Sequence, residues 1–280
     1  MKWKSYINDR KQDRGFKITK IRRKYTSIKI MGGIMMKISI DVIQKLSKIK
    51  NSVYDSIKIE YLYHSNKLEG STFSKENLID LLEQKQVIGE HFLNDVIETN
   101  NSLELFDEVI KSLNEPFDKY LLWNWHRILK KGSVDDEIDN IGKWKKYENR
   151  LSKTDLKLCE PHLVENNMFN LIEDWKESKK DIYAIADFHQ KFEQIHPFQD
   201  GNGRIGRFII LRQCIENDID LIAIDDKYNK EYRAALYKAQ TTKDIKDLVE
   251  IFVKCQVRLD EKLKEYEDLI NQVSREVNKN

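Results

Sequence analysis

Apolar residues recur every three or four positions along most of the chain after residue 40, and this spacing constrains the fold more than any other feature of the sequence. Apolar residues at such intervals line one face of an α-helix, whereas a strand would alternate them with polar residues. Alternation is scarce, so we expect an all-α helical bundle. The pattern breaks at 132–161, where Gly132, Gly142 and Pro161 favour a loop or one short β-hairpin.

Several helix ends can be placed from capping residues. Ser74 and Asp181 are suited to begin helices, and Pro116 is suited to open another. Pro197 disfavours helical geometry at the residue before it, so a helix should end at His196. The expected helices span about 41–68, 74–84, 91–112, 116–132, 163–177, 181–196, 204–215, 230–240 and 245–273.

Charge is unevenly distributed along the chain. Residues 1–37 hold twelve Lys or Arg against two Asp, a net charge of +10, whereas the whole chain carries +2 and the remainder therefore −8. We expect residues 1–40 to be a basic, disordered leader, or a non-native extension ahead of a start at Met35 or Met36. A nucleic-acid or membrane arm is the alternative. Residues 41–90 would form N-terminal helices, 91–255 the core, and 256–280 a C-terminal helix with a solvated tail.

The sequence gives no sign of an oxidising or membrane environment. Cys159, Cys214 and Cys255 are far apart and form no CxxC pair, which argues against a disulfide framework or a zinc knuckle. No apolar run is long enough to span a bilayer, and the basic N-terminus lacks the apolar stretch of a signal peptide. We therefore expect a cytoplasmic protein without a membrane partner.

The segment 196–207, His-Pro-Phe-Gln-Asp-Gly-Asn-Gly-Arg-Ile-Gly-Arg, is the most informative part of the chain. Gly201 and Gly203 bracket Asn202, so the backbone can approach a ligand closely there. A helix is expected to follow at once, and its free N–H groups and dipole attract an anion. Arg204 and Arg207 lie three residues apart, hence on one helix face, which suits a polyphosphate.

Two further side chains complete this candidate site. Asp200 is a lone carboxylate among cations, and a hard divalent ion bridging it to phosphate oxygens would explain its presence. A neutral imidazole at His196 could take a proton from an attacking hydroxyl. Together these groups indicate transfer from a nucleoside triphosphate. The competing interpretation is a tight interhelical turn with a capping Asp and a hydrogen-bonded His.

The segment resembles the signature of the Fic family, HxFx(D/E)GNGRxxR, at every defined position, and weaker helical similarity covers about residues 41–255. The resemblance implies a helical bundle that transfers AMP from ATP to a Ser, Thr or Tyr hydroxyl of a protein. It implies that His196 is the general base and that Asp200 holds Mg²⁺. It further implies that the nucleotide phosphates are bound by Gly201, Asn202, Gly203, Arg204 and Arg207. The acidic residue at position 200 favours nucleotidyl transfer over phosphotransfer.

Upstream of the core, the segment 65–70 (Ser-Asn-Lys-Leu-Glu-Gly) resembles the (S/T)xxxE(G/N) motif of the family's inhibitory helix. By that resemblance Ser65, Glu69 and Gly70 are regulatory, and Glu69 pairs with Arg207. A carboxylate there would occupy the guanidinium and repel the terminal phosphate, so ATP would bind unproductively. Taken alone, the segment is a helix end with a glycine stop and a solvated carboxylate.

Two weaker resemblances concern the substrates. The loop 142–152 is similar to the family's flap, which docks a target chain by main-chain pairing. Lys145 stands where an arginine is common, and an ordinary basic loop is the alternative. The candidate docking residues are Asn149, Arg150, Leu151 and Ser152. Tyr232 and Gln240 lie where the family often lines the adenine pocket, or they are a helix-face aromatic and a surface amide.

Other functions stay open at this point. His189, Glu193 and His196, spaced i, i+4 and i+7, could ligate zinc. Some relatives use the inhibitory glutamate to position water and remove AMP, so a de-AMPylase is an alternative, as is a non-catalytic ATP-sensing module. The expected partners are ATP and a protein substrate, which can be the chain itself. A homodimer is open, and nucleic acid is disfavoured because no helix-turn-helix signature follows residue 245.

Overall fold

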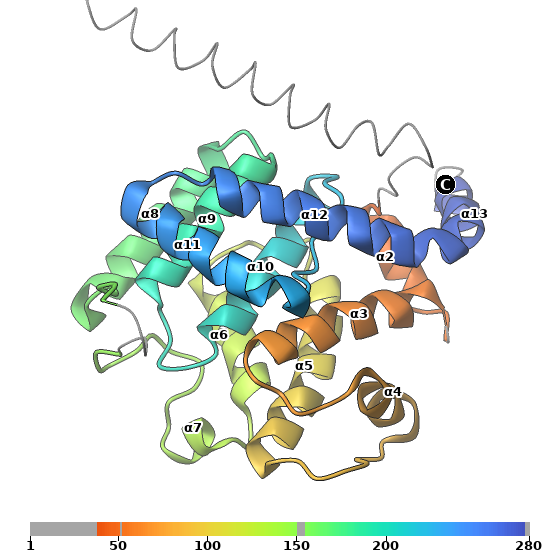
Figure 1. Cartoon of the computed structure of the whole chain (residues 1–280), viewed down its shortest axis with the longest axis horizontal. Helices are drawn as coiled ribbons and strands as arrows, with labels where there is room; N and C mark the ends of the chain where they lie inside the picture. Colours follow the sequence, from red (N-terminus) through yellow and green to blue (C-terminus); the bar gives the residue numbers. More distant parts are fainter. Residues whose placement is uncertain (1–37, 51, 150–154, 278–280) are drawn as a thin grey trace, which may run out of the picture. The chain divides into compact units, whose positions relative to one another are not determined.

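The computed structural model describes residues 38–50, 52–149 and 155–277, and the expected basic leader falls almost entirely outside them. Throughout these described ranges the chain forms helices and no strand, which confirms the all-α expectation (Figure 1). The α-helices are α2 (Ile40–Leu46), α3 (Val53–Leu68), α4 (Lys75–Gln84), α5 (Leu93–Lys111), α6 (Lys119–Lys130), α7 (Val134–Glu137), α8 (Val164–Glu177), α9 (Ile182–Ile195), α10 (Asn202–Glu216), α11 (Asn229–Thr242), α12 (Lys246–Leu263) and α13 (Glu267–Val277). Short 3-10 helices occur at η1 (Pro161–Leu163), η2 (Asp226–Tyr228) and η3 (Lys264–Tyr266).

The hairpin considered for residues 132–161 is not found in the described part of that segment. Its residues up to 149 contain the one-turn helix α7 and an irregular loop, and 150–154 lie outside the described residues. The predicted flap residues Arg150, Leu151 and Ser152 belong to that gap.

Capping side chains fix several helix starts where the sequence predicts them. Asp181 accepts hydrogen bonds from the backbone N–H groups of Tyr183 and Ala184, each at 3.0 Å, and thereby begins α9. Ser74 begins α4 with a complete capping box, in which the side chain of Asn77 reaches back to the backbone of Ser74. These bonds satisfy N–H groups that a helix start leaves without intrahelical partners.

The helix expected over 41–68 is divided into α2 and α3. Ser52 explains the break, because its hydroxyl donates to the carbonyl of Leu46 at 3.2 Å and accepts from the N–H of Tyr54 at 3.2 Å. A serine that caps a new helix competes with continued helical bonding. The apolar residues keep the same three-to-four spacing on both sides of this break, so the spacing alone does not predict where α2 ends. Helix α3 is therefore separate from α2. It carries residues 65–68, and Glu69 caps its C-terminal end.

The helix expected over 245–273 is similarly divided, at η3. The last helix, α13, packs against α2 through the buried side chains of Ile270 and Val273, and Glu276 forms an ion pair with Lys45 at 2.6 Å. Residues 38–277 thus belong to one compact unit, which includes the described residues of the three segments expected at 41–90, 91–255 and 256–280. No helix in the described part of the chain is long and apolar enough to cross a membrane.

Helix α10 lies at the centre of the core and packs against α3, α5, α6 and α9 (Figure 1). The apolar spacing predicted one buried face, but nearly all of its residues are buried, including Arg204, Arg207 and Arg212. A buried guanidinium is stable only when carboxylates or carbonyls accept its hydrogen bonds. The surrounding segments must therefore supply partners for these arginines, and the partners of Arg204 and Arg207 define the site described next.

Candidate functional site

The turn between α9 and α10 is held by its own side chains. His196 ends α9 in the left-handed conformation, with φ 51°, and Gly201 begins α10 at φ 80°. The amide of Asn202 accepts from the N–H of Phe198 at 2.8 Å and donates to the carbonyl of the same residue at 2.9 Å. The side chain of Asn202 therefore fixes the turn itself, and the backbone N–H groups at the start of α10 stay available to a ligand.

His126, on α6, joins this turn to the loop after α7. Its Nδ1 accepts from the N–H of Gly142 at 3.0 Å, and its Nε2–H donates to the carbonyl of Asp200 at 3.0 Å. These two bonds require the neutral ring with its proton on Nε2. Burial lowers the pKa of His126 to about 3, and its ring stacks on Phe198 with centroids 4.0 Å apart.

His196 is placed to accept a proton. Its Nδ1–H donates to the carbonyl of Glu193 at 3.3 Å, which leaves the lone pair on Nε2. Burial, followed by the positive charge of Lys145, lowers the pKa of His196 to about 4, so the ring is neutral near pH 7. The side chain keeps 16% of its surface exposed, so the ring remains within reach of solvent.

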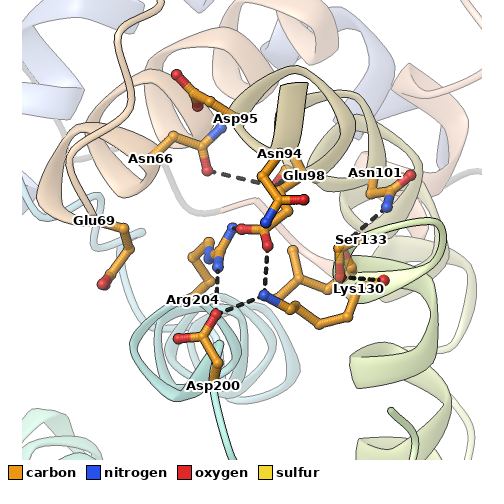
Figure 2. Close-up of polar contacts among 12 residues, drawn as sticks. Asn66, Glu69, Asn94, Asp95, Glu98, Asn101, Lys130, Ser133, Asp200 and Arg204 are labelled. Carbon is orange, nitrogen blue, oxygen red and sulfur yellow. Dashed lines mark hydrogen bonds and ion pairs between the residues drawn. The ribbon is translucent and has the colours of Figure 1, made fainter. Parts of the chain in front are cut away.

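Four charged side chains form a closed ring next to the turn (Figure 2). Lys130 is 1% exposed and forms ion pairs with Glu98 and, at 2.6 Å, with Asp200. Arg204 forms an ion pair with the other oxygen of Glu98 and lies 3.7 Å from Asp200. Burial would raise the pKa of Asp200, but the charges of Lys130 and Arg204 outweigh it and lower the pKa to about 2. Asp200 is therefore ionised.

The state of Asp200 fits a role as a magnesium ligand. Its side chain is 58% exposed, and both of its ion pairs use the same oxygen, Oδ2. An ionised carboxylate open to solvent suits Mg²⁺, which keeps several waters and binds through one or two carboxylates together with substrate phosphates.

Helix α3 and its C-terminal cap Glu69 supply the partners of Arg207. The guanidinium donates from Nε to the hydroxyl of Ser65 at 2.8 Å and from Nη2 to the carbonyl of Ser65 at 2.9 Å. It also forms an ion pair with Glu69 at 2.7 Å. Burial would raise the pKa of Glu69, but the charges of Arg207 and Arg204 lower it. The contact between Glu69 and Arg207 that the motifs suggested is thus present in the structure.

Glu69 also lies against the backbone at the start of α10. A Cβ added to Gly203 would come within 3.0 Å of Glu69 Oε1, so only glycine admits the carboxylate there. Glu69 caps the end of α3, and the chain reverses at Gly70 with φ 91°, a conformation that glycine adopts without strain. The carboxylate therefore lies over the N-terminal turn of α10, where an anionic ligand would bind.

Tyr232 and Gln240, the candidate adenine-pocket residues, are buried between helices. The hydroxyl of Tyr232 lies 2.7 Å from Nε2 of His189, and its side chain is 4% exposed. Gln240 is 5% exposed and donates to the carbonyl of Gln190 at 3.3 Å. Both residues join α11 to α9, and Gln240 is a buried amide and not a surface one.

The described part of the loop 142–152 is attached to the turn. The N–H of Lys145 donates to the carbonyl of Pro197 at 2.8 Å, and its ammonium donates to the carbonyl of Ile195 at 3.2 Å. Asn149 donates to the carbonyls of Phe198 and Gln199 at 3.1 and 3.3 Å. The loop therefore borders the candidate site, directly beside His196.

The zinc alternative is not supported by the geometry. Within the described residues, groups of three side chains that could share a metal ion are His64 with Asp225 and Asp226, and Glu98 with Asp135 and Asp200. The Nε2 of His189 instead contacts the hydroxyl of Tyr232. Glu193 Oε2 lies 3.9 Å from His196 Nδ1, and that nitrogen donates to the backbone carbonyl of Glu193.

Glu98, His126 and Lys130 belong to the site although no sequence motif predicts them. His126 and Lys130 are four residues apart on α6, which places them on one helix face, and this spacing is the only signal that could have drawn attention to them. Glu98 is 106 residues from its partner Arg204, and no local pattern reveals so distant a pair.

The helical fold and the turn between α9 and α10 resemble those of proteins with a Fic domain. Residues 116–214 match the sequence model described as Fic: Fic/DOC family. This segment of the chain is thus similar to Fic/DOC family domains. Two solved structures share the fold, each with a TM-score of 0.65. A Fic domain containing signaling protein from Bacteroides thetaiotaomicron is 18% identical, and the match covers 92% of this chain and 96% of that one. Fic-1 from C. elegans is 17% identical, and the match covers 97% of this chain and 79% of that one.

Sequence comparison shows homology to protein adenylyltransferases. The chain is 26% identical over 214 residues to Protein adenylyltransferase Fic of Nematostella vectensis, which covers 71% of this chain and 47% of that protein. It is 35% identical over 83 residues to a probable protein adenylyltransferase of Aquifex aeolicus, and this match covers 29% of this chain and 25% of that protein. The chain thus spans half or less of the length of these curated relatives.

Proposed function

We propose that this chain is a protein adenylyltransferase that Glu69 keeps inactive. The observation that carries the proposal is the position of Glu69, which pairs with Arg207 at 2.7 Å and lies over the first turn of α10. The homology to protein adenylyltransferases supports the choice of reaction. ATP is the proposed co-substrate, and the acceptor is a Ser, Thr or Tyr hydroxyl of a protein.

The proposed reaction uses His196 as the general base. Its Nε2 accepts the proton of the target hydroxyl while the hydroxyl oxygen attacks the α-phosphorus of ATP. A new oxygen–phosphorus bond forms to AMP, the bond from the α-phosphorus to the bridging oxygen breaks, and pyrophosphate leaves. The neutral state of His196 near pH 7 supports this role, because a protonated ring could not accept the proton.

The phosphates would lie at the start of α10. The N–H groups of its first turn and the guanidinium of Arg204 offer hydrogen bonds to the phosphate oxygens, and these donors stabilise negative charge as it develops. Asp200 would hold Mg²⁺, which supplies further charge stabilisation to the phosphates when bound. The flap residues Asn149, Arg150, Leu151 and Ser152 are proposed to dock the target, beside His196.

Inhibition would follow from competition for Arg207. With Glu69 in place, one side of the guanidinium is occupied and a carboxylate lies where the terminal phosphate would approach. Repulsion between the two anions would turn the triphosphate away from the pose that exposes its α-phosphorus. Ser65 and Gly70 support this state, since Ser65 binds the same guanidinium and Gly70 lets the chain reverse directly after Glu69.

The proposal can be tested by following the label of two forms of ATP. Wild type, Glu69→Gly and Glu69→Gly with His196→Ala are incubated with Mg²⁺, cell lysate and ATP labelled on either the α- or the γ-phosphate. After subtraction of the labelling by lysate alone, in which protein kinases transfer the γ-phosphate, we expect protein labelling from α-labelled ATP alone, strong with Glu69→Gly, weak with wild type and absent from the double variant. Glu90→Gly, an exposed carboxylate in the loop before α5, is the matched control and should label like wild type.

Other results would replace the proposal with a different function. Labelling from γ-labelled ATP would indicate phosphotransfer. Release of AMP from a labelled target by wild type, lost in Glu69→Gly, would indicate a de-AMPylase. Nucleotide binding by Glu69→Gly without labelling of any protein would indicate a sensing module. Equal labelling by wild type and Glu69→Gly would disprove inhibition by Glu69.

A further inference from the structure

Lys130 lies between three carboxylates, one of which is the candidate magnesium ligand Asp200. Its ammonium forms ion pairs with Glu98, with Asp135 at 2.6 Å and with Asp200 at 2.6 Å. Carboxylate oxygens of these three acids lie within 4.8 Å of one another, a spacing that a metal ion could occupy. The lysine side chain is only 1% exposed, so the surrounding helices hold its ammonium in place.

Glu98 and Asp200 also reach Arg204, the arginine proposed to bind phosphate. Glu98 binds Lys130 with Oε1 and Arg204 with Oε2, so one carboxylate joins the two cations (Figure 2). Three carboxylates thus face two cations, and removal of Lys130 would leave the cluster with a much larger excess of negative charge. Helices α5, α6 and α10 each contribute to this arrangement.

We propose that Lys130 is a positioning residue whose ammonium acts as a built-in cation in place of a metal ion. It neutralises Glu98 and Asp135, holds one oxygen of Asp200, and excludes a divalent ion from the space between the three acids. A divalent ion and an ammonium cannot share that space, because their charges repel at short range in a partly buried site.

The consequence is that Asp200 has only its other oxygen to offer to a metal ion. One carboxylate oxygen is a weak site for a divalent cation, since such ions need several oxygen ligands. Metal binding should then depend on phosphate oxygens, so the protein without nucleotide should bind divalent ions poorly. Lys130 would in this way link metal loading to nucleotide loading. This consequence rests on the proposed function, but the exclusion of metal by Lys130 does not.

The test is metal binding without nucleotide. Mn²⁺, which can be followed by electron paramagnetic resonance and by calorimetry, is titrated into wild type, Lys130→Met, Lys130→Arg and the control Lys131→Met, whose side chain is exposed. We expect weak binding by wild type and by Lys131→Met, and binding at least about tenfold tighter by Lys130→Met, because three carboxylates then face only one cation, Arg204. Lys130→Arg restores the charge and should restore weak binding, which a purely structural role of Lys130 would not predict.

Two further measurements keep the proposal testable if Lys130→Met folds poorly. Adding Glu98→Gln to Lys130→Met removes one ligand and one negative charge, and should weaken Mn²⁺ binding again. Wild type alone is also decisive: tight Mn²⁺ binding by the nucleotide-free wild type would overturn the proposal. Equal Mn²⁺ affinity of folded Lys130→Met and wild type would overturn it too. Neither outcome depends on whether the chain transfers AMP, so failure here is distinct from failure of the proposed function.

Discussion

The carboxylate of Glu69 lies so close to Gly203 that a Cβ on that glycine would come within 3.0 Å of its Oε1 atom. Glu69 ends α3, Gly203 is in the first turn of α10, and the two positions are far apart in sequence. The absence of a side chain at 203 is therefore what allows Glu69 to reach Arg207. A substitution at Gly203 therefore tests whether Glu69 lies against the start of α10.

Gly203→Ala should destabilise the protein through Glu69. The overlap should push the carboxylate from Arg207 and cost roughly 1–3 kcal/mol of unfolding free energy, as forced overpacking does. In the Glu69→Gly background the overlap with Glu69 is gone and the contact of the added Cβ with Arg207 Nη1 at 3.1 Å remains, so the same substitution should cost clearly less. Urea unfolding of the two single variants and the double variant measures this non-additivity.

Gly206→Ala is the control for this comparison of single and double variants. It is three residues further along α10, and its added Cβ would meet Glu193 Oε1 at 2.6 Å and Phe192 at 3.1 Å, both on α9. Removal of Glu69 should not relieve its cost, because Glu69 is not among the nearest atoms that this Cβ would meet. If Gly203→Ala is equally costly in both backgrounds, Glu69 does not lie against the start of α10.

The bonds of His126 should be needed to hold the turn in place. His126→Ala removes the acceptor for Gly142 N–H and the donor to the carbonyl of Asp200. Leaving buried polar groups unpaired and a ring-sized space empty should cost about 2–4 kcal/mol of stability. Thermal unfolding and nucleotide titration would show lower stability and weaker Mg-ATP binding. The exposed His162 serves as control, and His162→Ala should change neither quantity; an unchanged melting temperature for His126→Ala would contradict this role.

The sequence was a good guide to the helices and to the turn, for a physical reason. Ser74, Asp181 and Pro197 act within a few residues of their own position, so their effects can be predicted without knowing the rest of the fold. The break at Ser52 was missed because the apolar spacing continues across it, and only the hydrogen bonds of the serine hydroxyl show where α2 ends.

The site was predictable only where its members are close in sequence. The segment 196–207 places base, carboxylate and arginines together, and the resemblance of 65–70 to a known motif suggested the partner of Arg207. Glu98 and Lys130 come from α5 and α6 and meet Arg204 and Asp200 only after folding. Such pairs depend on helix packing angles, which no local sequence pattern specifies.

Stability should fall as the pH is lowered because buried neutral histidines resist protonation. Burial, followed by the charge of Arg207, lowers the pKa of His189 to about 3 from an ordinary value of 6.5. Between these values the unfolded chain binds a proton that the folded chain does not, so unfolding becomes easier as pH falls, by up to about 1.4 kcal/mol per pH unit.

His189→Gln should remove that contribution while keeping a polar partner for Tyr232. Urea unfolding at several pH values between roughly 7 and 5 should show a shallower pH dependence for His189→Gln than for wild type. His162→Gln, at an exposed ring, should leave the dependence as it is. Parallel curves for wild type and His189→Gln would show that His189 is not kept neutral by the fold.

Glu193 should have the opposite pH dependence. Burial raises the pKa of its carboxyl to about 7 from 4.5, against the lowering effect of Arg207 and with a further raising effect of Glu69. A raised pKa means that the folded chain holds a proton that the unfolded chain releases between these values. The contribution of the neutral acid to stability is therefore complete below about pH 4.5 and is lost as pH rises through 7.

Glu193→Gln keeps the shape of the neutral acid and cannot ionise, so it should equal wild type near pH 4.5 and become more stable than wild type above pH 7. The expected gap grows by up to about 1.4 kcal/mol per pH unit across that window. Glu69→Gly provides an internal check, because loss of the Glu69 charge leaves Arg207 free to lower the pKa of Glu193 and should reduce the gap at high pH. A gap that appears on acidification instead would mean that Glu193 is ionised in the folded protein, held by Arg207 in spite of its burial.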